Sequence, residues 1–305
     1  MAQSLVLHGR TLDVVLAVTR DEAGKLKEEG DKRRERADKR NIYLLREGGK
    51  VPMTIPYSVV DHVTVILPNT PGAETLGAAD IEKRTSSYNS RRALIRSNPS
   101  LYVSKTRLSV RQIPLFVTER MLKRLATHAV REFEREAKNG LRIGISDEER
   151  AEDAKTDDAD QEGHKSVIGK MTGVKQAKIV RQSERVDPVT DKGRSKGYGF
   201  VEMRKHSDAL RVLRWSNNNP AVGPLFEDWW KEELGDLIKR EAAKEDKDDA
   251  RLKRMKEELG GHNAKKKIGV LIVEFSIENV QVVRRRSAHQ DEAKVCLENS
   301  SHCRE

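Results

Sequence analysis

The chain of 305 residues carries 59 Lys and Arg against 49 Asp and Glu, a net charge of +10, and only 36% of its residues are hydrophobic. No apolar run is long enough to cross a bilayer, and the two cysteines, Cys296 and Cys303, stand too close to the C-terminus to form a disulfide framework. The sequence also lacks a Gly-x-x-x-x-Gly-Lys-Ser/Thr loop, a Cys-x-x-Cys pair and a His-Glu-x-x-His motif. We therefore predict a protein that is not an enzyme and that needs no cofactor or metal ion. We also predict that it has no membrane or small-molecule partner.

The first predicted element is a hairpin in residues 1–20, where aliphatic residues stand on both sides of Gly9-Arg10. A single hairpin cannot bury a core, so we interpret it as the remnant of a preceding domain; a chance pattern is the alternative. Residues 21–104 are expected to form a charged linker. Within it, residues 49–63 carry little charge beside their neighbours, and one hypothesis is that they are a non-native insert from a translated intron.

A short strand is predicted next, over Leu108–Pro114, with Pro114 ending it. Successive side chains of a strand point to opposite faces. Leu108 and Val110 therefore belong to a buried face, and Ser109 and Arg111 to the opposite one.

A helix is expected to follow, because Thr118 can cap it and the apolar residues after it recur at helical spacing. The stripe consists of Leu122, Leu125, Ala126, Ala129 and Phe133. We expect His128 to be a packing or surface residue, since no Cys or His stands at metal-ligand spacing from it. Residues 138–170 form a polar, charged insertion with too few apolar residues to fold well.

Two strands are then predicted, Val174–Val180 and the octamer Lys196–Met203, Lys-Gly-Tyr-Gly-Phe-Val-Glu-Met. Alternation places Tyr198 and Phe200 on one face, with the core on the other. Unstacked bases can lie on such aromatic rings. Four basic residues are expected to contact phosphate: Arg111 on the earlier strand, Lys192 and Arg194 before the octamer, and Lys196 at its start. The structural alternative is a sheet in which the aromatics pack across strands.

The last elements are a helix capped by Ser207, a partly helical insertion over 216–264, and a final strand over Val270–Phe275. Within the insertion, an apolar stripe that includes Trp229 and Trp230 either docks a partner or, as we favour, packs on its own domain. A mixed-charge helix is expected over Lys239–Leu259. Residues 287–305 are predicted to be a disordered tail.

Together the hexamer Leu108–Ile113, the octamer and the order β-α-β-β-α-β resemble an RNA-recognition motif (RRM). We predict an α+β, ferredoxin-like RRM over 105–286, with a four-stranded antiparallel sheet, two helices, two charged insertions and long polar arms. Two hexamer positions depart from the usual pattern, because Ser109 stands where a third stacking aromatic is common and Gln112 where Asn is common.

The chain also resembles the C-terminal third of the fungal nucleolar multi-RRM proteins needed for large-ribosomal-subunit assembly, which have an animal relative called RNA-binding motif protein twenty-eight. The similar segments are 9–15, 18–23, 39–48, 66–69, 97–101, 106–114 and 278–283. The N-terminal hairpin resembles the last hairpin of another RRM, so we interpret the chain as a C-terminal fragment of a multi-RRM protein or as a truncated gene model. The resemblance implies residence in the nucleus and nucleolus, binding to pre-ribosomal RNA, and pre-ribosomal assembly proteins as partners. It carries over Tyr198 and Phe200 as stacking positions, with Ser109 at the third.

Three functions stay open at this point. The first is an RNA-binding assembly factor that supports rRNA processing. The second is an RRM used for protein binding, in which the helices of the 216–264 insertion cover the sheet beside Ser109. The third is a structural adaptor whose charged helix bridges partners in a ribonucleoprotein. We favour the first, because Tyr198 and Phe200 are both present.

Overall fold

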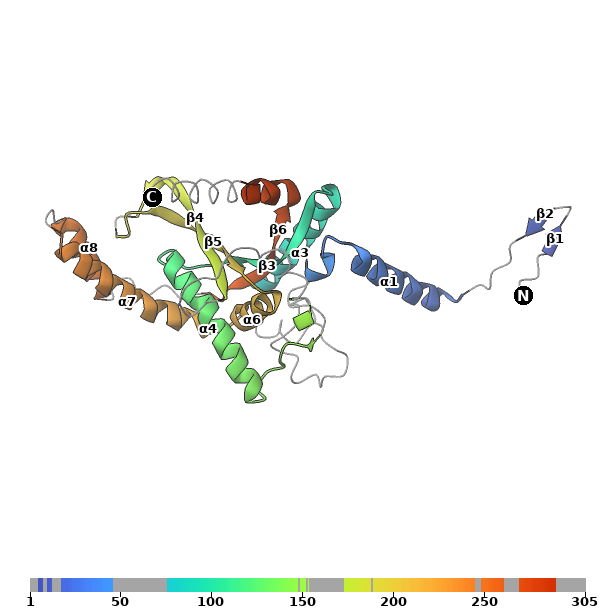
Figure 1. Ribbon diagram of the computed structural model, residues 1–305, viewed down its shortest axis with the longest axis horizontal. Coiled ribbons are helices and arrows are strands. Elements are labelled where there is room, and N and C mark those ends of the chain that lie inside the picture. Colours follow the sequence, from blue (N-terminus) through green and yellow to red (C-terminus); the bar gives the residue numbers. More distant parts are fainter. Residues whose placement is uncertain are drawn as a thin grey trace, which may run out of the picture.

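The computed structural model contains the expected strands and helices of the β-α-β-β-α-β order (Figure 1). It describes residues 5–7, 10–12, 18–45, 76–147, 149–151, 153, 173–187, 189–244, 248–260 and 269–288. The predicted insert at 49–63 lies outside the described residues. So do the part of the 138–170 insertion from residue 154 onward and nearly all of the predicted tail.

Four strands and two helices build the central domain: β3 (Leu101–Arg111), α4 (Glu119–Lys138), β4 (Val174–Val186), β5 (Gly193–Met203), α6 (His206–Ser216) and β6 (Ile272–Asn279). The strands lie in the order β4-β5-β3-β6, and each neighbouring pair is antiparallel. This arrangement confirms the predicted α+β ferredoxin-like fold, in which the hexamer and octamer segments form the two central strands.

The core lies between one face of this sheet and the helices α4 and α6. Leu108, Val201 and Met203 are buried on the sheet side, as alternation predicts. The whole predicted stripe of α4 is buried against them: Leu122, Leu125, Ala126, Ala129 and Phe133. Thr118 caps α4 as expected, because its Oγ1 accepts the backbone N–H of Met121 at 3.3 Å.

The predicted cap of α6 is wrong. Lys205 stands at the N-cap and makes no side-chain cap hydrogen bond, while the backbone N–H of Ser207 donates to Asp153 Oδ1 at 2.9 Å. Asp153 belongs to the charged insertion at 138–170. A distant carboxylate thus satisfies one of the N–H groups at the start of α6 that have no partner within the helix.

The 216–264 insertion forms α7 (Val222–Ala242) and α8 (Asp249–Leu259). Trp229 and Trp230 are only 6% and 7% exposed. The aromatic stripe therefore packs on its own domain, as the favoured interpretation predicts. The single helix expected over 239–259 is wrong, because α7 ends at Ala242 and Asp248 caps a separate helix by accepting the Arg251 N–H at 3.0 Å.

The N-terminal part contains the expected hairpin, β1 (Leu5–Leu7) and β2 (Arg10–Leu12). It also contains structure where a linker was expected: α1 (Arg20–Ala37), η1 (Ile42–Leu45) and α3 (Ala78–Ser97). β1 pairs with β2 as the predicted hairpin. The interpretation of this hairpin as the remnant of another domain stays a prediction. Leu44, Leu45 and Ile95 are at most 3% exposed and join the main core. The folded domain therefore includes η1, α3 and the first residues of β3, which were expected to be linker, while residues 46–75 of the expected linker lie outside the described residues.

Candidate nucleic-acid interface

Tyr198 and Phe200 lie on the face of β5 opposite to the one that α4 and α6 cover. Gly199 and Val201, which alternate with them, are buried toward the helices. The two rings are nearly perpendicular, with centroids 6.5 Å apart, and Tyr198 is 36% exposed. A pair of aromatic rings on the uncovered face of a sheet offers the surface on which unstacked bases can lie.

The two glycines of the octamer are required by the backbone. Gly197 has φ +76°, which residues with a side chain rarely adopt. A Cβ on Gly199 would lie 2.6 Å from the carbonyl oxygen of Lys178 on β4 and 3.3 Å from Leu122 Cδ2 on α4. Gly199 therefore permits the close approach of β4 and α4 to β5, which holds Tyr198 and Phe200 in place.

Phe200 already has a partner on this face that the sequence analysis missed. The Arg107 guanidinium carbon lies 4.7 Å from the Phe200 ring centroid, and the same guanidinium donates to Glu278 Oε1 on β6 at 2.9 Å. Glu278 also accepts a hydrogen bond of 3.4 Å from the Tyr102 hydroxyl. Burial and the nearby charge of Glu278 raise the pKa of Tyr102 to about 12. A base that stacks on Phe200 must share the ring with this cation or displace it.

Ser109 and Arg111 lie on the same face, but Arg111 is engaged. Ser109 stands in register between Phe200 on β5 and Glu274 on β6. Arg111 Nη2 donates to Glu274 Oε2 at 3.0 Å, and Glu274 is only 4% exposed. Arg111 thus forms an ion pair with a buried carboxylate, which a phosphate would have to displace, and its expected phosphate contact stays a prediction.

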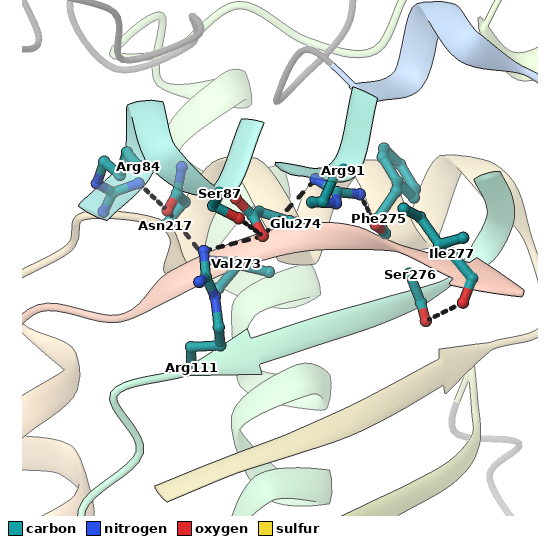
Figure 2. Close-up of polar contacts among 10 residues, drawn as sticks. All are labelled: Arg84, Ser87, Arg91, Arg111, Asn217, Val273, Glu274, Phe275, Ser276 and Ile277. Atoms are coloured by element: carbon teal, nitrogen blue, oxygen red, sulfur yellow. Dashed lines mark hydrogen bonds and ion pairs between the residues drawn. The ribbon is translucent and has the colours of Figure 1, made fainter. Parts of the chain in front are cut away.

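The helix α3 closes the β6 side of the face, as Figure 2 shows. Ser87 Oγ donates to Glu274 Oε2 at 3.1 Å, and Arg91 Nη1 lies 3.6 Å from the same oxygen. Nearer the start of α3, Arg84 is 2% exposed and donates to the Leu271 carbonyl oxygen at 3.2 Å. These contacts place α3 over β6 and leave β4 and β5 uncovered by it.

The basic residues before and at the start of the octamer differ in whether a carboxylate already pairs with them. Lys192 Nζ is 3.5 Å from Glu119 Oε2, and Arg181 Nε is 2.9 Å from Glu119 Oε1. Burial opposes ionisation of Glu119, but the hydrogen bond and charge of Arg181 outweigh it and hold the Glu119 pKa below its ordinary value. Arg194 and Lys196 are exposed and form no ion pair with another described residue.

A further cation on this face was not assigned from the sequence. Lys178 on β4 stands in register with Phe200, and its side chain is exposed. Cross-strand partners share a face of the sheet. The alternation of side chains along β4 was the sequence signal that could have placed Lys178 on this face. The uncovered half of the face thus combines Tyr198 and Phe200 with Lys178, Arg194 and Lys196.

The helical insertion does not cover this face. Glu233 of α7 accepts a hydrogen bond of 2.7 Å from Thr118 Oγ1 at the start of α4, and the Arg124 guanidinium of α4 lies 4.8 Å from the Trp229 ring centroid. The insertion therefore packs beside α4. The element that restricts the open face is α3, which had been interpreted as linker.

Other kinds of site find no support in the described part of the chain. Among these residues, no group of three or more His, Cys, Asp and Glu side chains is placed to hold a metal ion. His128 packs edge-on against Trp215 and Trp229, with centroids 5.3 and 5.7 Å away, and burial lowers its pKa. None of the helices within the described ranges has both the length and the apolar character to span a bilayer.

The sequence is similar to that of RNA-binding protein 28 from Homo sapiens. The two are 31% identical over 225 residues, which cover 73% of this chain and 22% of the human protein. The chain thus spans 22% of the length of the relative that it matches. No family model matches the chain, and no solved structure matches it.

Proposed function

We propose that the chain binds single-stranded RNA on the β4–β5 half of its sheet. The observation that carries this proposal is the exposed face where Tyr198 and Phe200 stand among Lys178, Arg194 and Lys196. Stacking on an aromatic side chain is worth about 1–3 kcal/mol per base and tolerates any base, while the cations track the phosphates. The similarity to a protein named for RNA binding supports the same conclusion.

The test is a fluorescence-anisotropy titration of the full chain with single-stranded RNA at fixed salt. The double variant Tyr198→Ala/Phe200→Ala should bind roughly one to four decades more weakly, because two stacking contacts are lost. The control Leu141→Ala/Leu259→Ala removes two apolar side chains that are 70% and 41% exposed elsewhere and should leave the affinity unchanged. Equal affinities of all three proteins, with the fold intact by circular dichroism, would reject the RNA face.

We further propose that the RNA is pre-ribosomal and that the protein supports rRNA processing and large-subunit maturation in the nucleolus, together with pre-ribosomal assembly proteins. The support is the resemblance of segments such as 39–48 and 97–101 to nucleolar multi-RRM proteins. Ultraviolet crosslinking of a tagged chain in cells should recover pre-ribosomal RNA, and the tag should colocalise with a nucleolar marker. Crosslinks spread over messenger RNAs would overturn this assignment.

A non-catalytic protein-interaction module is the second candidate. It is favoured by one observation, namely that Arg107 lies over Phe200 while α3 occupies the β6 side of the same face. In that case the double variant above would lose a partner protein instead of RNA. Affinity purification of the unchanged chain with and without ribonuclease separates the two functions, because a direct protein partner survives the treatment.

A further inference from the structure

β4 and β5 continue past the rest of the sheet as a two-stranded hairpin. The pairing between β3 and β5 runs as far as Tyr198. Farther out, the pairs Arg181–Ser195 and Val186–Gly193 join β4 to β5 alone. Tyr198 therefore stands at the point where the hairpin leaves the four-stranded sheet.

The charge of the uncovered surface differs between the two directions away from Tyr198 and Phe200. Along the hairpin, Arg185, Arg194 and Lys196 are exposed, and none of them forms an ion pair with another described residue. The hairpin also carries the acidic residues Glu184, Asp187 and Asp191. Arg181 and Lys192 are paired with Glu119 of α4, and Asp191 lies 4.0 Å from Arg251 of α8. Arg194 and Lys196, on the strand that carries Tyr198, are therefore cations that a phosphate can meet without displacing an ion pair.

In the other direction, from Phe200 across β3 to β6, a phosphate meets carboxylates. Glu274 and Glu278 both lie on this side, and each is already bonded to an arginine of β3. The helix α3 lies over Glu274 and contributes Ser87 and Arg91 to the same cluster. A strand of RNA crossing toward β6 would therefore have to displace α3 and two ion pairs.

The turn of the hairpin is held by α8. Arg251 donates from Nε and Nη2 to the carbonyl oxygen of Val189, at 3.2 and 3.1 Å. Val189 is 8% exposed and Met255 of α8 is fully buried. Within the turn, the Asp191 N–H donates to the Asp187 carbonyl oxygen at 2.9 Å. A hairpin ordered before binding loses less conformational entropy when it contacts a ligand.

We propose that bound single-stranded RNA leaves the sheet at Tyr198 and runs along the β4–β5 hairpin toward Gly193, instead of crossing β3 to β6. In this arrangement α8 is a positioning element, because it fixes the hairpin whose cations meet the phosphates. The inference rests on the proposed RNA binding and adds its path. The 216–264 insertion thereby acquires a role in RNA binding although it does not touch the sheet face.

The path is tested with a single-stranded RNA of twelve nucleotides and the full chain, titrated at several salt concentrations. Arg185→Gln/Arg194→Gln should flatten the slope of log affinity against log salt by about 1.4, because each lost phosphate contact on a single strand removes about 0.7. The matched control Lys83→Gln/Arg96→Gln removes two exposed cations from α3 and should leave the slope unchanged. A flatter slope for the α3 variant, together with an unchanged slope for the hairpin variant, would overturn the proposed path.

This outcome is distinguishable from failure of the proposed function. If the unchanged chain binds RNA and Tyr198→Ala/Phe200→Ala weakens it, while the hairpin variant behaves like the unchanged chain, only the path is wrong. If the unchanged chain binds no RNA, both proposals are overturned. Photocrosslinking with 4-thiouridine in the same RNA should label peptides of the β4–β5 hairpin; labels confined to β6 and α3 would also overturn the path.

The role of α8 is tested with Arg251→Met, which keeps the apolar stem and removes the bonds to Val189 together with the ion pairs to Glu241 and Asp191. Amide hydrogen exchange should become faster in the hairpin turn, and RNA affinity should fall by about fivefold, the equivalent of one ordinary hydrogen bond. Lys253→Met on the same helix removes an exposed cation and is the control. Faster exchange without any loss of affinity would show that α8 orders the hairpin but that RNA does not use it.

Discussion

Replacing Glu274 with Gln tests the polar network that docks α3 on β6. Glu274 is 4% exposed and faces two guanidinium groups, Arg111 at 3.0 Å and Arg91 at 3.6 Å, with Ser87 donating to the same oxygen. Removing one partner of a buried ion pair costs about 3–5 kcal/mol, because the other charge stays buried without compensation. The loss here should be smaller, about 2–3 kcal/mol, since Gln still accepts a hydrogen bond and the Arg111 side chain is 34% exposed.

The assay is urea unfolding of the full chain followed by circular dichroism, with the midpoint converted to free energy at constant m-value. Glu82→Gln, on an exposed position of α3, is the control and should change stability by less than about 0.5 kcal/mol. A double-mutant cycle with Arg91→Met isolates the pair, because it subtracts the separate cost of each substitution. A loss of less than about 0.5 kcal/mol for Glu274→Gln would refute the conclusion that this carboxylate holds α3.

The same substitution has a consequence for RNA binding. Without the carboxylate, Arg111 is free to meet a phosphate, so the salt slope should become steeper by about 0.7. A destabilised protein with an unchanged slope would show that the network is structural only. It would also show that Arg111 stays on the α3 side of the face.

Three further predictions concern the neighbours of the stacking face. Arg107→Met should free the Phe200 ring and tighten RNA binding by up to about fivefold, the worth of an exposed cation–π pair; weaker binding in the anisotropy titration, with a flatter salt slope, would instead assign Arg107 to a phosphate. Ser109→Phe should lower the thermal unfolding midpoint without tightening RNA binding, because overpacking beside the docked α3 costs about 1–3 kcal/mol; tighter binding at an unchanged midpoint would contradict this. The pKa of Tyr102 is raised by burial and by Glu278 from 10.0 to about 12, so the unfolded state ionises first. The contribution of Tyr102 to the free energy of unfolding is therefore complete below pH 10.0. This contribution is lost as the pH rises through about 12. Alkaline unfolding of Tyr102→Phe should show a smaller loss.

The parts of the fold that the sequence predicted depend on local periodicity. The stripe of α4, its Thr118 cap and the alternation around Tyr198 and Phe200 are decided by residues a few positions apart, and all three are confirmed. Burial of Trp229 and Trp230 was also predictable, because large aromatics at helical spacing bury most area when they pack on their own domain. These features required no knowledge of distant segments.

The features that were missed depend on contacts distant in the sequence. α3 carries few apolar residues in a regular stripe, and it docks through polar side chains, Arg84, Ser87 and Arg91, whose partners lie more than 130 positions away. Glu274 in a strand pattern suggests a solvated position, yet it is the buried centre of that network. Arg111 was placed on the correct face, but alternation cannot show that a carboxylate of β6 stands beside it.

The composition of the open face favours one of the two proposed classes of partner. A protein that docks on a surface requires a patch whose centre is apolar and depleted of charge. The exposed large apolar side chains of the described residues are instead scattered over separate elements: Val18, Leu26, Leu94, Leu115, Leu141, Val186, Tyr198 and Leu259. On the uncovered half of the sheet, the adjacent rings of Tyr198 and Phe200 have the cations Lys178, Arg194 and Lys196 as neighbours. This composition suits a flexible, regularly charged polymer with flat bases, and it supports the proposed RNA binding over the second candidate.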